Sequence, residues 1–247
     1  MCNNWPGFPI SIEGATGGLI GDTVIICGGE DGSSIVDECY SLTSEKATLV
    51  THMSVGRNEA ASIVINDNTL WVTGGSNNYG FFASTEYVTV TGTMLGPDLP
   101  MALRRHAMVA INRTCSMVIG GYTYTYTFSV STFFYDHNEG EWINGPSLIQ
   151  ERMYHAAGIV TDEVTNEALV AVTGGKYHSD GCQLFYYLDS TEILQDGEWV
   201  QGKISNITND TGSHKGIIDA LNTATLLAQG EYITRMDADD LMPIKKL

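Results

Sequence analysis

Leu70-Trp71-Val72-Thr73-Gly74-Gly75 is an apolar run that ends on a pair of glycines, and the chain contains this pattern four times. The other copies are Val24-Ile25-Ile26-Cys27-Gly28-Gly29, Met117-Val118-Ile119-Gly120-Gly121 and Leu169-Val170-Ala171-Val172-Thr173-Gly174-Gly175. Successive glycine pairs are 46, 46 and 54 residues apart. A period of roughly 40 to 50 residues, filled with short β-rich runs, is typical of one four-stranded unit per repeat. The sequence therefore predicts a mainly β repeat protein.

Three further runs accompany each glycine pair. Upstream lies an apolar run that follows an arginine in three of the copies. These arginines are Arg57, Arg105 and Arg152. Downstream, runs such as Ser84-Thr85-Glu86-Tyr87-Val88 are rich in the β-branched and aromatic residues that strands favour. A last run contains Trp142 in the third copy and Trp199 in the fourth, while Leu49 and Leu95 stand roughly there in the first two.

This order of features resembles the kelch repeat, in which a strand closes on two glycines and is followed by a tyrosine, a tryptophan and an arginine that leads into the next copy. The resemblance implies a β-propeller over residues 1–202. About four blades are visible, so the propeller is expected to be incomplete, because closed propellers of this kind usually have about six. Such a scaffold implies an interaction module that binds a protein or a carbohydrate and performs no chemistry.

The residues of the repeat are expected to be structural. Glycine pairs permit close approach of backbones and positive φ. Each arginine is expected to bond carbonyls of a neighbouring blade, and each tryptophan to fill the gap between blades. His106 and His155 directly follow or nearly follow two of the arginines, and we expect them to serve the repeat rather than a metal.

Partner contacts are expected on loops that the scaffold presents at one end. The candidate loops are residues 31–36, 76–81, 122–128 and 176–183. In the third loop Tyr122, Tyr124 and Tyr126 alternate with threonines, which could place three rings on one face of an extended strand. An extended edge hairpin, with its aromatic face packed on a neighbouring blade, is an equally good interpretation.

Cysteines and glycosylation sequons bear on the compartment. Cys27 and Cys39 lie on strands expected to be neighbours, so a disulfide between them is possible and would require an oxidising compartment. Asn112-Arg113-Thr114, Asn206-Ile207-Thr208 and Asn209-Asp210-Thr211 have the sequence of N-glycosylation sites. Since the start of the chain does not resemble a signal peptide, an extracellular and a cytoplasmic location both stay open.

Composition excludes several classes of partner. Asp and Glu number 29 against 12 Lys and Arg, which gives a formal net charge of -17. Nucleic acid is not an expected partner, because phosphate attracts basic surfaces. The chain has no apolar run long enough for a transmembrane segment, and its five cysteines do not have the spacing of a zinc site.

The sequence changes character after Gly202. Residues 203–212 are expected to be a polar linker. Residues 213–247 are expected to form a short α/β segment: a helix with an apolar stripe that stops at Gly230, then a strand over 231–236.

Three short motifs in this segment resemble the middle of a family-2 glycosyltransferase. They are Ala220-Leu221-Asn222, Gly230-Glu231-Tyr232-Ile233 and Asp237-Ala238-Asp239. The resemblance implies that Asp237, Asp239 and Asp240 contact a nucleotide-sugar donor, with Asp239 on a metal ion. Mn²⁺ or Mg²⁺ would neutralise the leaving diphosphate, and no other cofactor is expected. The resembling stretch lacks both flanking halves of such an enzyme, so this chain alone is not expected to be active.

Overall fold

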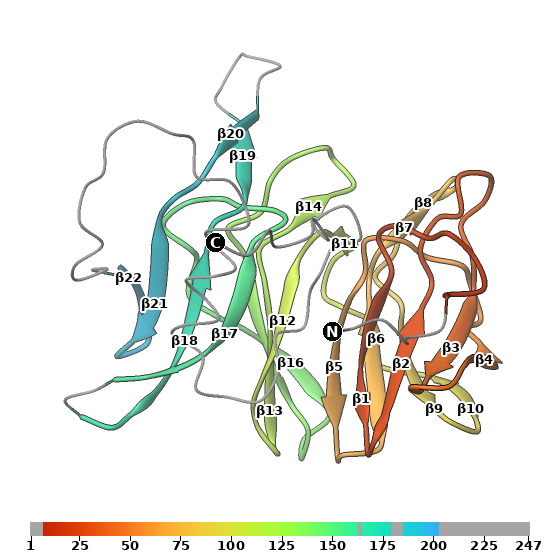
Figure 1. Ribbon diagram of the computed structural model, residues 1–247. Coiled ribbons are helices and arrows are strands. Elements are labelled where there is room, and N and C mark those ends of the chain that lie inside the picture. The colour runs from red at the N-terminus through yellow and green to blue at the C-terminus, as the bar shows by residue number, and fades with distance from the viewer. Residues whose placement is uncertain (1–6, 163–164, 179–184, 203–247) are drawn as a thin grey trace, which may run out of the picture. The chain divides into compact units, whose positions relative to one another are not determined.

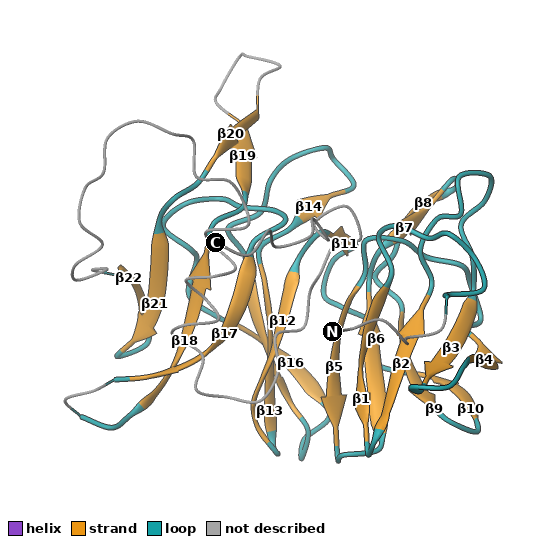
Figure 2. Cartoon of the chain, in the orientation of Figure 1, coloured by secondary structure: helices purple, strands orange, loops and turns teal. Residues whose placement is uncertain are grey.

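The computed structural model describes residues 7–162, 165–178 and 185–202, and within these ranges it contains strands and no helix (Figure 2). The expected linker and α/β segment over 203–247 lie outside the described residues. The described chain falls into two compact units, one ending at Arg104 and the other beginning at Arg105. The mainly β prediction is confirmed.

The first unit contains two four-stranded antiparallel sheets (Figure 1). The first sheet has the order β1 (Thr16–Ile20), β2 (Thr23–Cys27), β3 (Glu38–Leu42) and β4 (Ala47–His52). The second has the order β10 (Gly92–Leu95), β9 (Thr85–Thr89), β6 (Thr69–Thr73) and β5 (Ala61–Ile65). The short strands of this unit are β7 (Ser76–Asn77), β8 (Gly80–Phe81) and β11 (Leu103–Arg104).

The second unit repeats this arrangement. The third sheet has the order β12 (Ala107–Asn112), β13 (Cys115–Ile119), β15 (Thr132–Asp136) and β16 (Glu141–Asn144). The fourth has the order β17 (Ala156–Thr161), β18 (Ala168–Thr173), β21 (Thr191–Gln195) and β22 (Glu198–Gln201). The short strands are β14 (Tyr122–Thr123), β19 (Lys176–His178) and β20 (Phe185–Tyr187).

The glycine pairs occupy the same place in all four sheets, directly after the second strand. All eight glycines have φ between 60° and 102°, a region that side-chain-bearing residues rarely adopt. The second glycine of a pair also donates its N–H to a carbonyl in the connection to the next sheet. These bonds join Gly29 to Arg57 at 2.9 Å, Gly75 to Leu103 at 2.8 Å and Gly121 to Arg152 at 2.8 Å. The pairs therefore fix each connection onto the sheet before it.

Each unit has its own core between its two sheets. In the first unit, Ile20 and Ile25 pack with Leu70, Val72 and Val88. Gly18 in β1 lets the second sheet approach, because a Cβ there would meet the side chains of Val64 and Leu70 at 2.7 and 2.9 Å. The core of the second unit is formed by Val109, Met117, Ile119, Leu148, Val170, Val172 and Trp199.

Two of the arginines form buried ion pairs within their own sheets. Arg57 Nη2 lies 2.7 Å from Glu86 Oε1, and the two side chains are 0% and 1% exposed. Arg57 Nη1 donates to the carbonyl of Gly74 at 2.8 Å. The Arg152–Glu192 pair repeats this geometry, with 2.6 Å between Nη2 and Oε1 and 2.8 Å from Nη1 to the carbonyl of Gly174. These guanidinium groups thus bond the sheet they lead into, and not a neighbouring sheet as the sequence suggested.

Desolvation acts on both guanidinium groups. It lowers the pKa of Arg57, and the Glu86 carboxylate opposes that shift. It lowers the pKa of Arg152 in the same way, against the hydrogen bond and charge of Glu192. The second oxygen of each carboxylate accepts a backbone N–H, from Ser54 at 2.7 Å and from Ile149 at 2.7 Å. Each buried charge therefore has both a counter-charge and hydrogen-bond partners.

Arg105 is not equivalent to the other two arginines, which corrects the sequence prediction. Arg57 and Arg152 lie four residues before the first paired residue of β5 and β17, and Leu103 has that place before β12. Leu103 is fully buried. Its carbonyl accepts the N–H of Gly75, just as the carbonyls of Arg57 and Arg152 accept the N–H of a second glycine. The β15 position that matches Glu86 and Glu192 is Phe133, so arginine and glutamate are both replaced by apolar residues. Arg105 instead holds the position of Glu59 and Tyr154, and all three residues have φ between 55° and 58°.

We predict that the buried pair of the second sheet depends on both partners. Arg57→Leu alone leaves the Glu86 carboxylate buried without its counter-charge, and we expect it to lower the free energy of unfolding by about 3–5 kcal/mol. The double variant Arg57→Leu/Glu86→Phe copies the third repeat and should cost clearly less than Arg57→Leu. Urea unfolding of the full chain measures both, and a double variant no more stable than Arg57→Leu contradicts the prediction.

Candidate binding surface

Each glycine pair is followed by a loop, and these loops leave equivalent ends of their sheets. In the second unit, β14 with its turn and the β19–β20 hairpin extend from the same end of the third and fourth sheets (Figure 1). In the first unit, the loop after β2 and the β7–β8 hairpin hold the corresponding positions. Side chains on these loops can reach a partner without disturbing the cores.

The loop over residues 122–128 is a closed turn and not the extended strand that the alternation suggested. β14 covers only Tyr122 and Thr123, and Tyr126 has a φ of 60°. The Thr123 N–H donates to the Thr127 carbonyl at 2.9 Å, and the hydroxyls of these two threonines lie 2.8 Å apart. The Thr125 hydroxyl lies 2.9 Å from the hydroxyl of Thr123 and 3.1 Å from that of Thr127. The threonine hydroxyls bond one another within the turn, and the side chains of Tyr124 and Tyr126 are exposed.

Aromatic rings of this turn contact one another and reach β20 of the β19–β20 pair. Ring centroids of Tyr122 and Tyr126 lie 6.3 Å apart, and those of Tyr122 and Phe128 lie 5.2 Å apart. Phe128 lies 6.3 Å from Phe185 on β20. Tyr124 and Tyr126 are 64% and 71% exposed. We call the following set the aromatic surface: Tyr122, Tyr124, Tyr126, Phe128, Phe185, Tyr186 and Tyr187.

Two cations border the aromatic surface. Lys176 Nζ lies 5.2 Å from the ring centroids of both Tyr154 and Tyr187. The guanidinium carbon of Arg105 lies 4.5 Å from the Tyr154 centroid. Cations at such distances over an aromatic face are attracted by its quadrupole. Arg105, which does not hold the buried arginine position of the repeat, therefore approaches this surface through Tyr154.

The corresponding loops of the first unit carry fewer aromatic residues. Tyr79 at the tip of the β7–β8 hairpin is 96% exposed, and Phe81 lies under the Arg104 guanidinium at 4.4 Å. In the loop after β2, N–H groups of Ser34 and Ser33 bond Asp31 and lower the pKa of its carboxyl. This loop is a local turn around one acidic side chain.

Three histidines of the second unit are buried or partly buried. His106 and His155 are buried at equivalent positions before β12 and β17. Ser116 Oγ lies 2.8 Å from His137 Nε2, but Ser116 is fully buried and out of reach of a substrate. Burial also lowers the pKa of His137. Among the described residues, no three His, Cys, Asp or Glu side chains lie close enough to share a metal ion.

The two fourth-strand tryptophans have different contacts. Trp199 is buried, and its Nε1 donates to the Pro146 carbonyl of the preceding connection at 3.1 Å. Trp142 packs on Tyr135 of its own sheet, with 4.9 Å between ring centroids. In the second sheet Thr93 stands at the tryptophan position, and its hydroxyl donates to the His52 carbonyl at 3.0 Å. Leu95, which the sequence placed there, is exposed.

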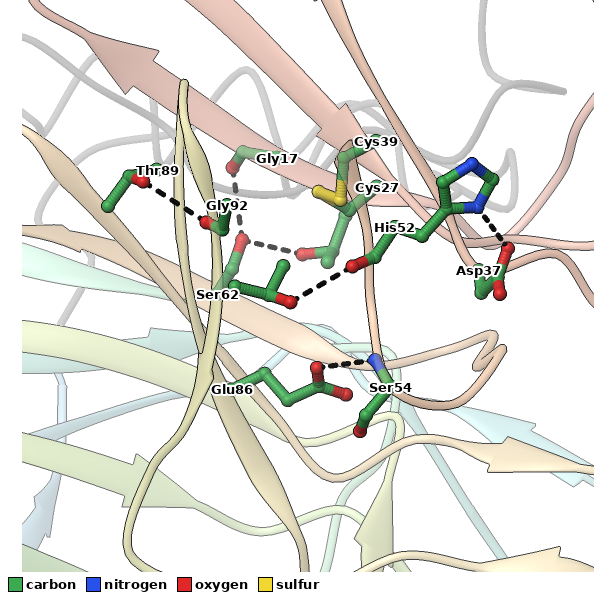
Figure 3. Close-up of a disulfide and its surroundings, with 12 residues drawn as sticks. Gly17, Cys27, Asp37, Cys39, His52, Ser54, Ser62, Glu86, Thr89 and Gly92 are labelled. Atoms are coloured by element: carbon green, nitrogen blue, oxygen red, sulfur yellow. Dashed lines mark hydrogen bonds and ion pairs between the residues drawn. A yellow bond between two sulfur atoms is a disulfide. The ribbon is translucent and has the colours of Figure 1, made fainter. Parts of the chain in front are cut away.

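Cys27 and Cys39 form a disulfide between β2 and β3 (Figure 3). The two cysteines are directly opposite in the antiparallel register. The same register places Thr73 opposite Thr85 in the second sheet and Thr173 opposite Thr191 in the fourth. Nearby, Asp37 accepts a hydrogen bond from His52, which raises the pKa of that histidine. The disulfide thus occupies a cross-strand site that two other repeats fill with threonines.

Sequence reasoning located part of the aromatic surface and missed the rest. Tyr122, Tyr124 and Tyr126 were candidates, whereas the Phe185-Tyr186-Tyr187 run fell just beyond the fourth candidate loop. Glu86 and Glu192 were also missed as partners of arginine. The sequence signal that could have identified these two glutamates is a Ser-Thr-Glu motif shared by two repeats, Ser84-Thr85-Glu86 and Ser190-Thr191-Glu192. Asp237, Asp239 and Asp240 lie outside the described residues.

Comparison with known proteins shows a fold and no family. No protein-family model matches the chain, and no curated protein matches it. Many solved structures are similar, among them that of a protein called YjhT. The two chains are 14% identical with a TM-score of 0.70, over 81% of this chain and 74% of the other. Among the described residues, no helix has the length and apolar character needed to cross a membrane.

We predict that threonines can replace the disulfide. Cys27→Ser/Cys39→Ser should lower the free energy of unfolding by about 2–4 kcal/mol, because the unfolded chain is no longer cross-linked. Cys27→Thr/Cys39→Thr copies the second and fourth sheets and should recover part of that loss through better packing. Urea unfolding under oxidising conditions compares the three proteins. Equal stability of the serine variant and the parent would show that this disulfide does not stabilise the fold.

Proposed function

We propose that the four sheets are blades of a kelch-type β-propeller and that the chain is an interaction module for a protein partner. The partner contacts the aromatic surface of the second unit. The observation that carries this proposal is the cluster of exposed tyrosines on loops that follow the glycine pairs. Four equivalent sheets with equivalent connections support the propeller, and the likeness to YjhT supports a shared fold.

Order within the turn favours binding. The threonine hydroxyls bond one another, and the Gly121 carbonyl accepts the Ser129 N–H at 2.9 Å where the loop returns to the sheet. A loop that is already fixed loses little conformational freedom when a partner binds, so more of the contact energy appears as affinity. The tyrosines are therefore presented by a preorganised support.

The composition of the aromatic surface favours a protein over other ligands. Tyrosine and arginine are enriched among the residues that dominate protein interfaces. Tyrosine also supplies a large rigid contact area with one polar group, which is why binding loops of antibodies contain so much of it. Tyr124, Tyr126 and Tyr187 are exposed, and Arg105 and Lys176 supply hydrogen-bond donors at the edge.

A second proposed function rests on residues 213–247. Their resemblance to a family-2 glycosyltransferase suggests that this protein binds a nucleotide sugar through Asp237, Asp239 and Asp240. Clustered carboxylates are suitable ligands for Mn²⁺ or Mg²⁺ beside a diphosphate. In such a protein the blades would provide partner contacts beside the transferase.

The first proposal is tested with a displayed library of random peptides and the full chain as bait. We expect enriched peptides whose affinity falls by at least about thirtyfold in Tyr124→Ser/Tyr126→Asn, since central tyrosines of an interface contribute about 2 kcal/mol or more. Asparagine is chosen at 126 because it tolerates positive φ.

The matched control for this test is Leu95→Ser, which removes an equally exposed apolar side chain from β10, at 69% exposure. This control should bind the same peptides with unchanged affinity. A glycan array screened in parallel covers the other partner class. Binding of glycans without peptides would assign a carbohydrate ligand instead, and equal peptide binding by both variants would exclude the aromatic surface.

The second proposal is tested by calorimetric titration of the full chain with UDP-sugars in the presence and absence of Mn²⁺. We expect binding that requires the metal and disappears in Asp239→Ala, because the metal bridges the carboxylate and the diphosphate. Absence of heat in both conditions would rule out donor binding by this chain. Peptide binding at the aromatic surface would be unaffected by that result.

A further inference from the structure

The turn between β12 and β13 is closed by the side chain of Asn112. Asn112 is the last residue of β12, and it pairs with Cys115, the first residue of β13. Arg113 and Thr114 form the turn between them, and all three residues from Asn112 to Thr114 are exposed. The turn is held in place by the neighbouring connection, because His137 donates its N–H to the Thr114 carbonyl at 2.9 Å.

Thr114 donates two hydrogen bonds to one atom of Asn112. The Oδ1 of Asn112 accepts the backbone N–H of Thr114 at 2.8 Å and its hydroxyl at 2.9 Å. Such a turn, in which an asparagine side chain bonds the backbone two residues on, is a common local motif. Here it also engages the hydroxyl of the residue that an Asn-x-Thr sequon requires. Two donors on Oδ1 polarise the carboxamide and leave its Nδ2 as the group available for reaction.

The disulfide between Cys27 and Cys39 is an independent observation on the compartment. Disulfides form and persist in oxidising compartments such as the secretory route and are rare in the cytosol. N-glycosylation of Asn-x-Ser/Thr sequons is a modification of secreted and surface proteins. A chain that carries a disulfide therefore meets the compartment requirement for N-glycosylation.

We propose that Asn112 is an N-glycosylation site. The co-reactant is an oligosaccharide joined through its terminal C1 to a polyprenyl diphosphate, presented by a transferring enzyme. The bond from C1 to the diphosphate oxygen breaks, and its electron pair leaves with the diphosphate. A bond forms from C1 to Nδ2 of Asn112, and the proton lost from Nδ2 passes to a base of the transferring enzyme.

The position of this turn is compatible with binding at the aromatic surface. β13 runs from Cys115 to Ile119 and then into Gly120-Gly121, where the tyrosine loop begins. Asn112 therefore lies at the opposite end of the third sheet from Tyr122. A glycan on Asn112 would cover the end of the sheet that the proposed partner does not use.

The test uses the full chain directed into the endoplasmic reticulum of a eukaryotic cell by an added signal sequence. Mass spectrometry of the peptide that contains Asn112 is carried out after enzymatic removal of N-glycans in heavy-oxygen water. We expect Asn112 to appear as aspartate with one heavy oxygen atom. Peptide-level detection is needed because Asn206 and Asn209 belong to the other two sequons and are left intact.

Two variants of Thr114 serve as the matched pair. Thr114→Val keeps the shape of the side chain but removes the hydroxyl, and modification of Asn112 should be lost completely. Thr114→Ser keeps the hydroxyl and should keep the modification. A non-reducing peptide map that shows Cys27 joined to Cys39 establishes that the protein reached the oxidising compartment. Unmodified Asn112 in molecules with this disulfide would overturn the proposal, as would equal modification of the valine variant.

Discussion

The hydrogen bond from the second glycine of each of the first three pairs to the next connection is the contact on which the repeat depends. At Gly75 a Cβ would also lie 2.7 Å from the Asn58 carbonyl in the connection that enters the second sheet, so any other residue would push that connection away from the strand end. Gly75 also has a φ of 88°, which adds a backbone cost for side-chain-bearing residues. Close approach and backbone conformation thus demand glycine at one position for two separate reasons. Both the start of the next sheet and the start of the loop are fixed there.

Around this fixed backbone, side-chain chemistry varies in matched pairs. Two repeats have a buried arginine–glutamate pair, Arg57 with Glu86 and Arg152 with Glu192. The third repeat has Leu103 at the arginine position and Phe133 at the glutamate position. A buried, hydrogen-bonded ion pair and an apolar pair of similar volume often differ little in stability, because desolvation offsets the Coulombic attraction. Selection for the fold therefore leaves the choice of pair open while it excludes a lone charge. The cross-strand cysteines and threonines follow the same logic.

This freedom explains which features could be predicted from sequence. The glycine pairs and apolar runs predicted the strands, since backbone geometry and core burial leave few alternatives at those positions. The arginine was a poor marker of register: in the third repeat Arg104-Arg105 lies beside the true position, which Leu103 occupies. Similarly, strict alternation in Tyr122-Thr123-Tyr124-Thr125-Tyr126 favours a strand. The turn forms because threonine hydroxyls bond one another, an interaction that hydrophobic periodicity does not encode.

The direction of the strands divides each sheet into two ends with different chemistry. At the end where the second strand meets the glycine pair, loops are long enough to carry exposed rings, as in Tyr124 and Tyr187. At the other end, connections such as Arg113-Thr114 are tight turns with polar residues. Exposed tyrosines contribute nothing to the core, and a cluster of them on a loop with internal hydrogen bonds supports the proposed interaction surface. A tight polar turn does not expose an aromatic surface, but it can hold a single asparagine in one conformation. The sheet thereby separates a surface suited to recognition from a site suited to modification.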